Sequence, residues 1–523
     1  MSEETHTTQT QQQAELQKRL WAIANDLRGN MDASEYRNYI LGLIFYRFLS
    51  DQIVEHADKM LAPDHLTFAE AYAKPDYKDA VKDELVGQVG FFIEPQYLFP
   101  SLVKNIQDGH FDVEQLQNAV NAVQNSTLGQ ESESDFRGLF EDMDLSASRL
   151  GNTVAKRSAL IGKVILSLAN ISFKEADLKI DVLGDAYEYL IGQFAAGAGK
   201  KAGEFYTPQQ VSKLLAQIVT MGRSELKQVY DPTMGSGSLL LQLGNYAKVG
   251  EYYGQEINGT TYNLARMNLL MHGVNYSRFN LYLGDTLEED HVDSMTFDAV
   301  VANPPYSANW DPAGKLDDER FRKYGKTAPK SKADFAFVEH MLYHLSATGT
   351  MAVVLPHGVL FRGAAEGAIR RYMIEQDNVL DAVIGLPANL FYGTSIPTCV
   401  LVFKKGRDRN DVLFIDASSD FEKGKNQNTL PDVDVQKILD AYKKREDVDK
   451  YAHVASLDEI KENDYNLNIP RYVDTFEPEA PIDIDEVKQQ LAEVDQQIKD
   501  AQAEFDKLAS QLVWTDKGDH DDK

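Results

Sequence analysis

The spacing of apolar residues changes once along the chain, near residue 200. Between Leu16 and about residue 170, apolar side chains recur every three or four positions, which predicts a helical amino-terminal domain. The aromatic residues of this region keep the helical spacing, so we interpret them as core residues and not as base-stacking groups. They are Tyr36, Tyr39, Phe45, Tyr46 and Phe48. After the stretch AAGAGKKAG, short apolar strands alternate with helices, which is typical of a parallel α/β sheet.

Apolar runs in the second region predict the strands of one sheet, with helices at 333–345 and 363–375 between the later strands. The expected strands are 228–231, 252–255, 279–283, 297–302, 350–356, 379–385 and 398–404. The first residues are rich in Gln and Thr, and we expect them to be disordered. The predicted organisation is a disordered tail at 1–14, a helical domain at 15–175, an α/β domain at 176–475, and a carboxyl-terminal helix with a tail at 476–523.

A last helix follows the Pro- and Asp-rich turn EPEAPIDID, and its apolar positions alternate steps of four and three. They form a heptad seam of roughly three and a half repeats, as in a coiled coil. The seam consists of Val487, Leu491, Val494, Ile498, Ala501, Phe505, Leu508 and Leu512. So regular a stripe favours contact with a partner helix. Packing of this helix back onto its own domain is the alternative.

Composition places the chain among globular proteins without a membrane span. It has 523 residues, 43% of them hydrophobic and 26% charged, and no apolar run is long enough to cross a bilayer. The amino terminus is polar and does not resemble a signal sequence, so a cytoplasmic location is expected. The single cysteine, Cys399, lies in an apolar run and is expected to be a core residue.

The formal net charge of −28 bears on the choice of partner. An acidic chain repels nucleic acid, because phosphate groups are neutralised by Lys and Arg. Either the substrate is not nucleic acid, or DNA is held by local basic patches and by a partner that supplies a positive surface. Charge alone does not decide between these two possibilities.

The fourth expected strand ends in the turn Asn303-Pro304-Pro305-Tyr306. In an open α/β sheet, ligands bind outside the carboxyl ends of the strands. The prolines remove two amide donors, so the side-chain oxygen of Asn303 and the carbonyl of Pro304 are expected to accept hydrogen bonds from a planar exocyclic amine. Tyr306 is expected to stack on the ring of that amine. The alternative is a proline turn that ends the strand with an aromatic plug.

Acidic residues end the three preceding strands. Asp231 leads into the Gly-rich loop DPTMGSGS, where glycines allow a tight turn and a close approach of the backbone to a ligand. The loop is neither a GxGxxG fingerprint nor a P-loop. Glu256 ends the next strand, where an acid usually binds ribose hydroxyls, and Asp285 ends the third, in position to meet an adenine amino group. Each acid alone would more often be a turn residue or a helix cap, but three in register indicate a ligand site.

The segment Gly203–Pro208, GEFYTP, lies just before this sheet. Thr207 is placed to cap the helix that begins at Pro208 or Gln209. Together, DPTMGSGS, Glu256, Asp285 and NPPY look like an S-adenosylmethionine-dependent methyltransferase of the amino-group class. GEFYTP, the run LPHGVLFRGAAEGAIR at 355–370 and the run ANLFYGTSIPTCVLVF at 388–403 resemble the modification subunit of type I restriction-modification systems.

This resemblance covers nearly the whole chain, and it implies a Rossmann-like, seven-stranded methyltransferase domain behind a helical domain. It also implies methyl transfer from S-adenosyl-L-methionine to N6 of adenine in DNA. The implied partners are DNA, a specificity subunit that binds two modification subunits, and a restriction/translocase subunit for cleavage. In the family, the terminal helix docks on the specificity subunit, which would bring the base-reading surface.

The resemblance also implies a role for individual residues, and no metal ligand is among them. The implied cofactor-binding residues are Glu204, Phe205, Tyr206, Thr207, Pro208, Gln209, Asp231, Thr233, Met234, Gly235, Ser236, Gly237, Ser238, Glu256 and Asp285. The residues that hold the flipped adenine are Asn303, Pro304, Pro305 and Tyr306. The pair Phe391-Tyr392 resembles the motif that stacks on the other face of the base, and which of the two does so is left open.

Three rival functions share the NPPY turn or the cofactor loop. A glutamine side chain in a protein also presents a planar amine, but such enzymes are smaller and lack the helical flanks and the terminal heptads. N4 of cytosine is a chemically closer rival, and Asn303 favours adenine by resemblance only. The third rival is a degenerate scaffold that binds the cofactor without catalysis. The intact acids and the intact turn argue against it.

Overall fold

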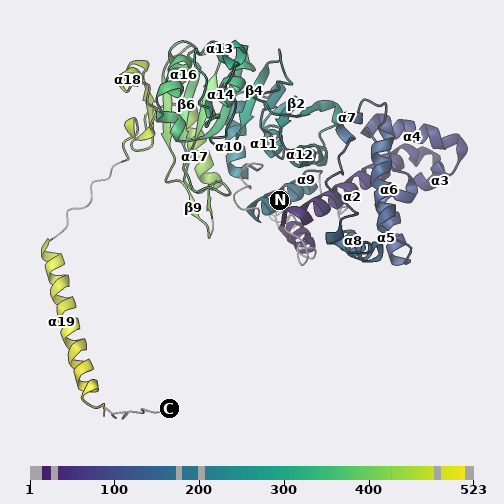
Figure 1. The fold of residues 1–523 in the computed structure, drawn as a ribbon, viewed down its shortest axis with the longest axis horizontal. Coiled ribbons are helices and arrows are strands. Elements are labelled where there is room, and N and C mark those ends of the chain that lie inside the picture. Colours follow the sequence, from purple (N-terminus) through teal and green to yellow (C-terminus); the bar gives the residue numbers. More distant parts are fainter. Residues whose placement is uncertain are drawn as a thin grey trace, which may run out of the picture. The chain divides into compact units, whose positions relative to one another are not determined.

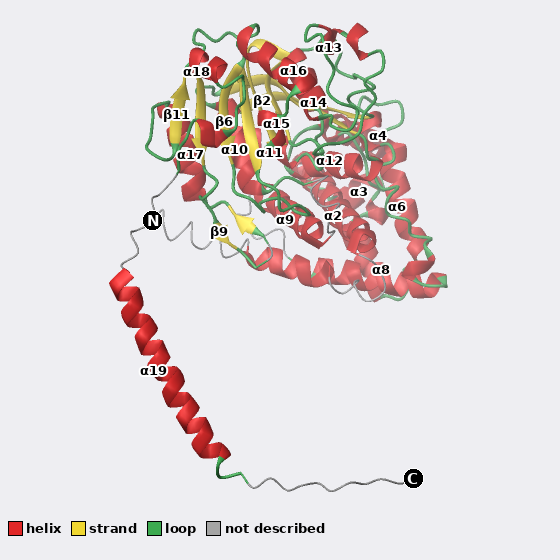
Figure 2. Cartoon of the chain, turned by 60° about the vertical axis from the view of Figure 1, so that its left-hand side comes forward, coloured by secondary structure: helices red, strands yellow, loops and turns green. Residues whose placement is uncertain are grey.

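The computed structural model describes residues 14–24, 33–171, 180–197, 206–425, 427–475 and 484–512. The chain divides into two compact units, Met1–Asp474 and Thr475–Lys523. Within the first unit, a helical region precedes a twisted sheet that carries helices on both faces (Figure 1). Figure 2 shows the strands of this sheet side by side between the helices. Among the described residues, no helix is both long and apolar enough to span a membrane.

The helical region has its own hydrophobic core, which includes all five aromatic residues that the sequence assigned to a core. That interpretation is confirmed. The same core contains residues of α9 (Ile180–Gly197) and one face of α12 (Gly259–Met271), which join the helical region to the sheet. The other helices are α2 (Ala33–Leu61), α3 (Phe68–Tyr72), α4 (Pro75–Val89), α5 (Phe99–Gln107), α6 (Val113–Ser126), α7 (Glu133–Phe136) and α8 (Val154–Ala169), with 3-10 turns η1 (Ala62–Asp64), η2 (Pro95–Tyr97) and η3 (Ser148–Leu150).

The main sheet has nine strands in the order β11-β8-β6-β7-β5-β4-β1-β2-β3. All seven expected strands are present, and β8 and β11 extend the sheet beyond β6, so the prediction of seven strands was two short. The strands are β1 (Glu225–Asp231), β2 (Lys248–Glu256), β3 (Phe279–Leu283), β4 (Phe297–Ala302), β5 (Leu345–Pro356), β6 (Leu380–Gly385), β7 (Thr398–Lys404), β8 (Val412–Asp416) and β11 (Ala452–Ala455), while β9 (Glu422–Lys423) and β10 (Asn428–Thr429) form a separate hairpin.

Strands β3, β2, β1, β4 and β5 run parallel, and β7 is inserted antiparallel between β5 and β6. The chain moves to opposite sides after β1 and β3, so β1 and β4 become neighbours, paired at Val229 with Ala299 and at Tyr230 with Val300. A change of direction of this kind opens a crevice at the carboxyl ends of the two strands. The Gly-rich loop after β1 and the NPPY turn after β4 therefore begin side by side.

Alternate residues of the strands pack into two hydrophobic cores, one on each face of the sheet. Val229 belongs to the core under α10 and α11, and its neighbour Tyr230 to the core under α14. This alternation follows from the two-residue repeat of a strand. The helices around the sheet are α10 (Gln209–Thr220), α11 (Ser238–Leu243), α13 (Glu319–Arg322), α14 (Asp334–Tyr343), α15 (Gly358–Phe361), α16 (Ala364–Glu375), α17 (Asp432–Lys444) and α18 (Leu457–Glu462), with turns η5 (Tyr276–Arg278), η6 (Lys315–Asp317) and η7 (Ile469–Arg471). Cys399 on β7 is buried, as expected.

The second unit consists of α19 (Ile484–Ala509) with a short extension to residue 512. None of the side chains of this helix is buried. Its seam of large apolar residues is between 48% and 66% exposed at Val487, Leu491, Val494, Ile498, Phe505, Leu508 and Leu512. The expected helix is therefore present, and no other described residue of this unit covers its apolar stripe.

Candidate active site

The loop after β1 begins with a carboxylate that is almost fully enclosed. Asp231 is 1% exposed, and its Oδ1 accepts a hydrogen bond of 2.9 Å from the backbone amide of Thr233. Burial raises the pKa of this carboxyl to about 8, and the negative charge of Glu256 also raises it, against the hydrogen bonds from Thr233. No described residue forms an ion pair with Asp231. A cationic ligand group would therefore meet an acid that has no positive partner in the protein.

The Gly-rich loop turns where glycine is required. Gly235 and Gly237 both have positive φ angles, of 55° and 76°. A Cβ atom on Gly237 would lie 2.7 Å from Cδ1 of Leu269, so a side chain there would also push against the Leu269 side chain of α12. Ser236 and Ser238 are buried on this loop, and their hydroxyls are 2.9 Å apart.

Glu256 at the end of β2 braces the same loop. Its Oε2 accepts a hydrogen bond of 3.1 Å from the amide of Gly235, and its Oε1 accepts one of 2.8 Å from the amide of Asn258. Burial raises the pKa of Glu256, while these amides act in the opposite direction. Like Asp231, Glu256 has no ion-pair partner among the described side chains. Two enclosed carboxylates thus face one loop, which suits a ligand that carries positive charge and hydroxyl donors.

Asp285 follows β3 and is half-buried. Its Oδ1 accepts a hydrogen bond of 3.0 Å from the amide of Leu287. One of its carboxylate oxygens therefore stabilises the turn that contains it. The other expected cofactor residues of the sheet lie closer together, around one small cavity. This cavity is lined by Tyr206, Thr207, Asp231, Thr233, Met234, Gly235, Ser236, Ser238, Leu239 and Asn303. The expected residues Pro208, Gln209, Gly237, Glu256 and Asp285 lie outside that lining, and Glu204 and Phe205 lie outside the described residues.

The side chain of Asn303 is held from two directions. Its Nδ2 donates to Oγ1 of Thr207 at 3.2 Å, and its Oδ1 accepts a hydrogen bond of 2.8 Å from the hydroxyl of Tyr306. The prediction that Thr207 caps α10 is wrong, because Pro208 is the capping residue and no side chain caps the helix. The Thr207 hydroxyl accepts from the Asn303 amide instead. An amide oxygen has two lone pairs, so Oδ1 retains one for a further donor.

Two aromatic residues near the turn occupy different environments. The rings of Tyr306 and Phe391 meet edge to face, with centroids 6.0 Å apart and planes at 78°. Phe391 is buried in the core of the sheet, whereas Tyr392 is half-buried and packs at 6.1 Å from Tyr206. Tyr392 also lines a larger cavity of about 560 Å³ together with Tyr206, Pro208 and Gln209. The structure brings both members of the pair near the site, and which of them stacks on a base stays open.

Sequence reasoning missed two buried acids near these loops. Asp334 is fully buried at the start of α14, and its Oδ1 accepts a hydrogen bond of 2.8 Å from the amide of Ser307, the residue after the NPPY turn. Glu188 on α9 is 3% exposed and lines the larger cavity, and burial raises its pKa to about 8. An acid within the apolar run ADFAFVEHML was a usable signal for Asp334, whereas Glu188 lies in an ordinary amphipathic helix.

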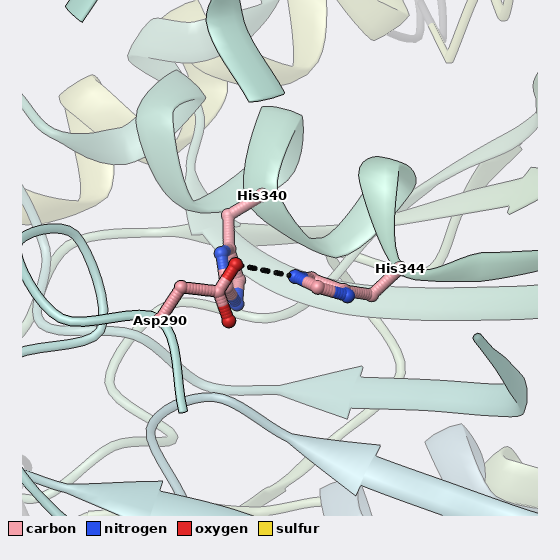
Figure 3. Close-up of side chains that lie close together, drawn as sticks. All are labelled: Asp290, His340 and His344. Carbon is pink, nitrogen blue, oxygen red and sulfur yellow. Dashed lines mark hydrogen bonds and ion pairs between the residues drawn. The ribbon is translucent and has the colours of Figure 1, made fainter. Parts of the chain in front are cut away.

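A group of side chains with metal-binding chemistry lies behind the cofactor loops, formed by Asp290, His340 and His344 (Figure 3). All four ring nitrogens of the two histidines have a protein partner, and the guanidinium of Arg320 lies 3.9 Å from Asp290. This guanidinium also pairs with Asp318 at 2.7 Å, so two carboxylates share its positive charge. These residues are therefore accounted for by their own hydrogen bonds.

The sheet order, the Gly-rich loop and the NPPY turn define an amino-group methyltransferase. A family model described as N-6 DNA Methylase matches residues 178–480, and one described as HsdM N-terminal domain matches residues 16–168. The chain belongs to the N-6 DNA methylase family, and the family prediction made from its motifs is confirmed.

Relatives across the full length support the same assignment. The chain is 38% identical to the type I restriction enzyme MpnII methylase subunit of Mycoplasma pneumoniae, over 94% of this chain and 95% of that protein. It is 31% identical to the MjaVII methylase subunit of Methanocaldococcus jannaschii, over 88% and 78% of the two chains. Among solved structures, the type I restriction-modification methyltransferase subunit from Streptococcus thermophilus is 46% identical, with a TM-score of 0.83, over 88% of this chain and 100% of that one.

Proposed function

We propose that this chain, as the adenine-specific DNA methyltransferase subunit of a type I restriction-modification system, holds its target adenine at the turn Asn303–Tyr306. The observation that carries the proposal is the placement of Asn303 on the same small cavity as Asp231 and the Gly-rich loop. A group that binds an exocyclic amine and a group that binds a cationic cofactor thereby meet at one point. That arrangement is what methyl transfer to an amine requires.

The residues present fit S-adenosylmethionine, which carries an ammonium group, a sulfonium and two ribose hydroxyls. When bound, the cofactor supplies the methyl group. Asp231 and the loop from Thr233 to Ser238 would hold its amino-acid part, and Glu256 would hold its ribose. The two enclosed carboxylates support this fit, because each lacks a positive partner among the described residues. Asp285 at the end of β3 would meet the adenine edge of the cofactor.

The NPPY turn prepares the amine of the target base for attack. The base must first leave the duplex, at a cost of roughly a few kcal/mol, because its N6 is inaccessible within the stack. Asn303 Oδ1 would accept one amine hydrogen on its remaining lone pair, and the carbonyl of Pro304 would accept the other. This carbonyl accepts no hydrogen bond from a described backbone amide. Both contacts favour a pyramidal nitrogen, whose lone pair is withdrawn from conjugation with the ring and becomes available for attack.

Positioning accounts for most of the catalysis in this scheme. The hydroxyl of Tyr306 fixes the orientation of the Asn303 amide, and the Thr207 hydroxyl fixes it from the other side. Asn303 is neutral and is not a strong base, so the amine proton leaves after the methyl group has been transferred. No protein nucleophile takes part.

The terminal helix α19 would dock on the specificity subunit. Its seam is exposed along its length, as a partner helix would require. The net charge of −28 also supports a specificity partner, because that partner would supply the positive surface that reads DNA. We propose two modification subunits for each specificity subunit, a restriction/translocase subunit for cleavage, and action in the cytoplasm.

The test is to produce the chain in a host that lacks adenine methylation, with and without its specificity partner, and to map modified bases in the host DNA. We expect N6-methyladenine at one bipartite motif, only with the partner present. The variant Asn303→Ala should abolish the modification, whereas Asn121→Ala, at an exposed position of α6, should not. Methylation by the chain alone would contradict the role of the partner. Methylation by Asn303→Ala at the normal level would contradict the assigned site.

A further inference from the structure

Helix α14 carries buried polar side chains at its first residue and around its last turn, and they contact residues that lead into both halves of the active site. Asp334, His340 and His344 are all fully buried at or just beyond the ends of this ten-residue helix. We propose that α14 is a rigid strut whose buried side chains Asp334, His340 and His344 set the position of the target-base turn relative to the cofactor loops. The proposal rests on the proposed function and concerns positioning residues, since none of these side chains lines the cavity.

The first end of the strut holds the target-base turn. The turn continues directly into Ser307, whose φ angle of 51° is unfavourable for a residue with a side chain. Asp334 Oδ1 accepts the hydrogen bond of the Ser307 amide at 2.8 Å. Its Oδ2 accepts a hydrogen bond of 2.6 Å from Nη2 of Arg362, so the carboxylate cannot rotate away. Both oxygens are thereby committed, and the turn is fixed to the helix.

The second end of the strut holds the strand that leads into the Gly-rich loop. Nε2 of His340 lies 2.9 Å from the hydroxyl of Tyr230, the residue before Asp231. His344 lies 2.9 Å from Asp290 through Nε2 and 2.9 Å from the carbonyl of Met295 through Nδ1. Figure 3 shows the hydrogen bond between His344 and the carboxylate of Asp290, which follows the turn at Asp285, and the ring of His340 beside that carboxylate.

Arg320 connects this end of the helix to both cofactor turns. Its Nη1 lies 3.1 Å from Nδ1 of His340 and donates to the carbonyl of Thr286 at 2.8 Å. The hydroxyl of Thr286 donates in turn to the carbonyl of Pro232 at 2.5 Å. A continuous chain of hydrogen bonds therefore runs from α14 through the turn after Asp285 to the loop after Asp231.

The network is suited to transmit a displacement because it has little freedom to relax. The apolar side chains of α14, including Phe335 and Met341, are part of the tightly packed core on that face of the sheet. Polar groups enclosed at low dielectric and fully partnered hold their geometry strongly. Burial and the neighbouring His344 lower the pKa of His340, so its ring stays neutral and keeps its pattern of partners. A shift at one end of α14 should thus appear at the other.

The experiment looks for effects across the helix, in the complex with the specificity partner. Asp334→Asn directly disturbs only the base side, because one of the two accepting carboxylate oxygens becomes an amide NH2 group, which cannot accept from the Ser307 amide or from Arg362. His340→Phe disturbs only the cofactor side and keeps a ring. Affinity for S-adenosylhomocysteine is measured by calorimetry, and affinity for a target duplex by fluorescence anisotropy. We expect each variant to weaken both ligands, with the distant ligand weakened about 5-fold or more, the lower range of measured site-to-site couplings.

Controls separate this effect from general damage. Asp108→Asn and His110→Gln change the same residue types in the exposed loop between α5 and α6, and both should leave the two affinities unchanged. Thr286→Val removes only the hydrogen bond from the Thr286 hydroxyl to the carbonyl of Pro232. If His340→Phe fails to fold, this variant tests the same chain of hydrogen bonds. It should weaken S-adenosylhomocysteine and, through the strut, the target duplex.

Two results would overturn the proposal: variants that weaken only the ligand on their own side, and variants that weaken neither ligand. Failure of the wild-type complex to bind S-adenosylhomocysteine would instead contradict the proposed function. The two failures are therefore distinguishable in one set of titrations.

Discussion

Replacing Asp231 by Asn is expected to stabilise the ligand-free protein while it weakens cofactor binding. The substitution keeps the shape of the side chain and an oxygen that can accept the hydrogen bond from the Thr233 amide. It removes the ionisation that the enclosed site opposes, since burial raises the pKa of Asp231 to about 8. Stability and function are thus expected to change in opposite directions at this one position.

The magnitude follows from the difference between the folded and unfolded pKa values of this carboxyl. An unfolded aspartate has a pKa of about 3.9, so between roughly pH 4 and pH 8 the folded protein binds more protons than the unfolded chain. The contribution of Asp231 to stability therefore falls as pH rises through this window, by roughly 1.4 kcal/mol for each pH unit. At pH 7 the wild-type carboxyl destabilises the folded state by roughly 4 kcal/mol, and the Asp231→Asn variant is free of this penalty.

The assay is urea denaturation of the ligand-free wild type and Asp231→Asn from pH 6 to pH 9, above the sequence pI of about 4.8, where solubility is lowest. The gain in the free energy of unfolding should increase with pH up to about pH 8 and then level off. Affinity for S-adenosylmethionine should fall by about 10-fold to 150-fold. This range corresponds to the loss of one hydrogen bond that involves a charged group. A gain that does not vary with pH, or a variant less stable than the wild type at pH 8, would refute the reasoning.

Three further predictions concern single contacts. Tyr306→Phe removes the hydroxyl that orients Asn303, and kcat should fall by about 2-fold to 13-fold, the equivalent of one hydrogen bond, with unchanged cofactor affinity. Gly237→Ala should destabilise the protein more than Gly222→Ala. Both glycines have positive φ angles, but only a Cβ atom at position 237 would meet a neighbouring atom. The melting temperatures of the two variants test this. Leu491→Asp, in the exposed seam of α19, should abolish co-purification with the specificity partner and leave the melting temperature of the isolated chain unchanged.

Each of these predictions has a result that contradicts it. Full activity of the Tyr306 variant would mean that the hydroxyl does not position Asn303. Equal melting temperatures for the two glycine variants would mean that the loop and α12 are not tightly packed at Gly237. A Leu491 variant that assembles normally would place the partner contact elsewhere on the chain.

The sequence predicted those parts of the fold that depend on local pattern. Strand β4 was predicted with its observed bounds, because an apolar run is stopped by two prolines that cannot continue a ladder. The terminal helix was predicted because its heptad repeat is visible in the sequence even when the partner is unknown. Strand β11 was missed because it has four residues and is stabilised mainly by pairing with β8 at the edge of the sheet.

The candidate site was predictable in its residues and not in their mutual contacts. Motifs identified Asp231 and Asn303, but Thr207 was assigned to a local helix cap, and it accepts from Asn303, 96 positions along the chain. Asp334 is marked in the sequence as an acid within an apolar run, but its contact with the turn was missed because its partner Ser307 is 27 positions away. Long-range hydrogen bonds of this kind leave no periodic signal in a sequence, and only the fold brings their partners together.

The buried thiol of Cys399 has a practical consequence for studying this chain. It is the only cysteine in the sequence, it is fully buried on β7, and burial raises its pKa well above that of a free thiol. Thiolates, not thiols, react with maleimide dyes, so the natural protein should resist labelling while folded. A cysteine introduced on the polar face of α19 would then take a single fluorophore without any background mutation. Docking of the helix, and its release, would become visible as a change in the emission of one dye.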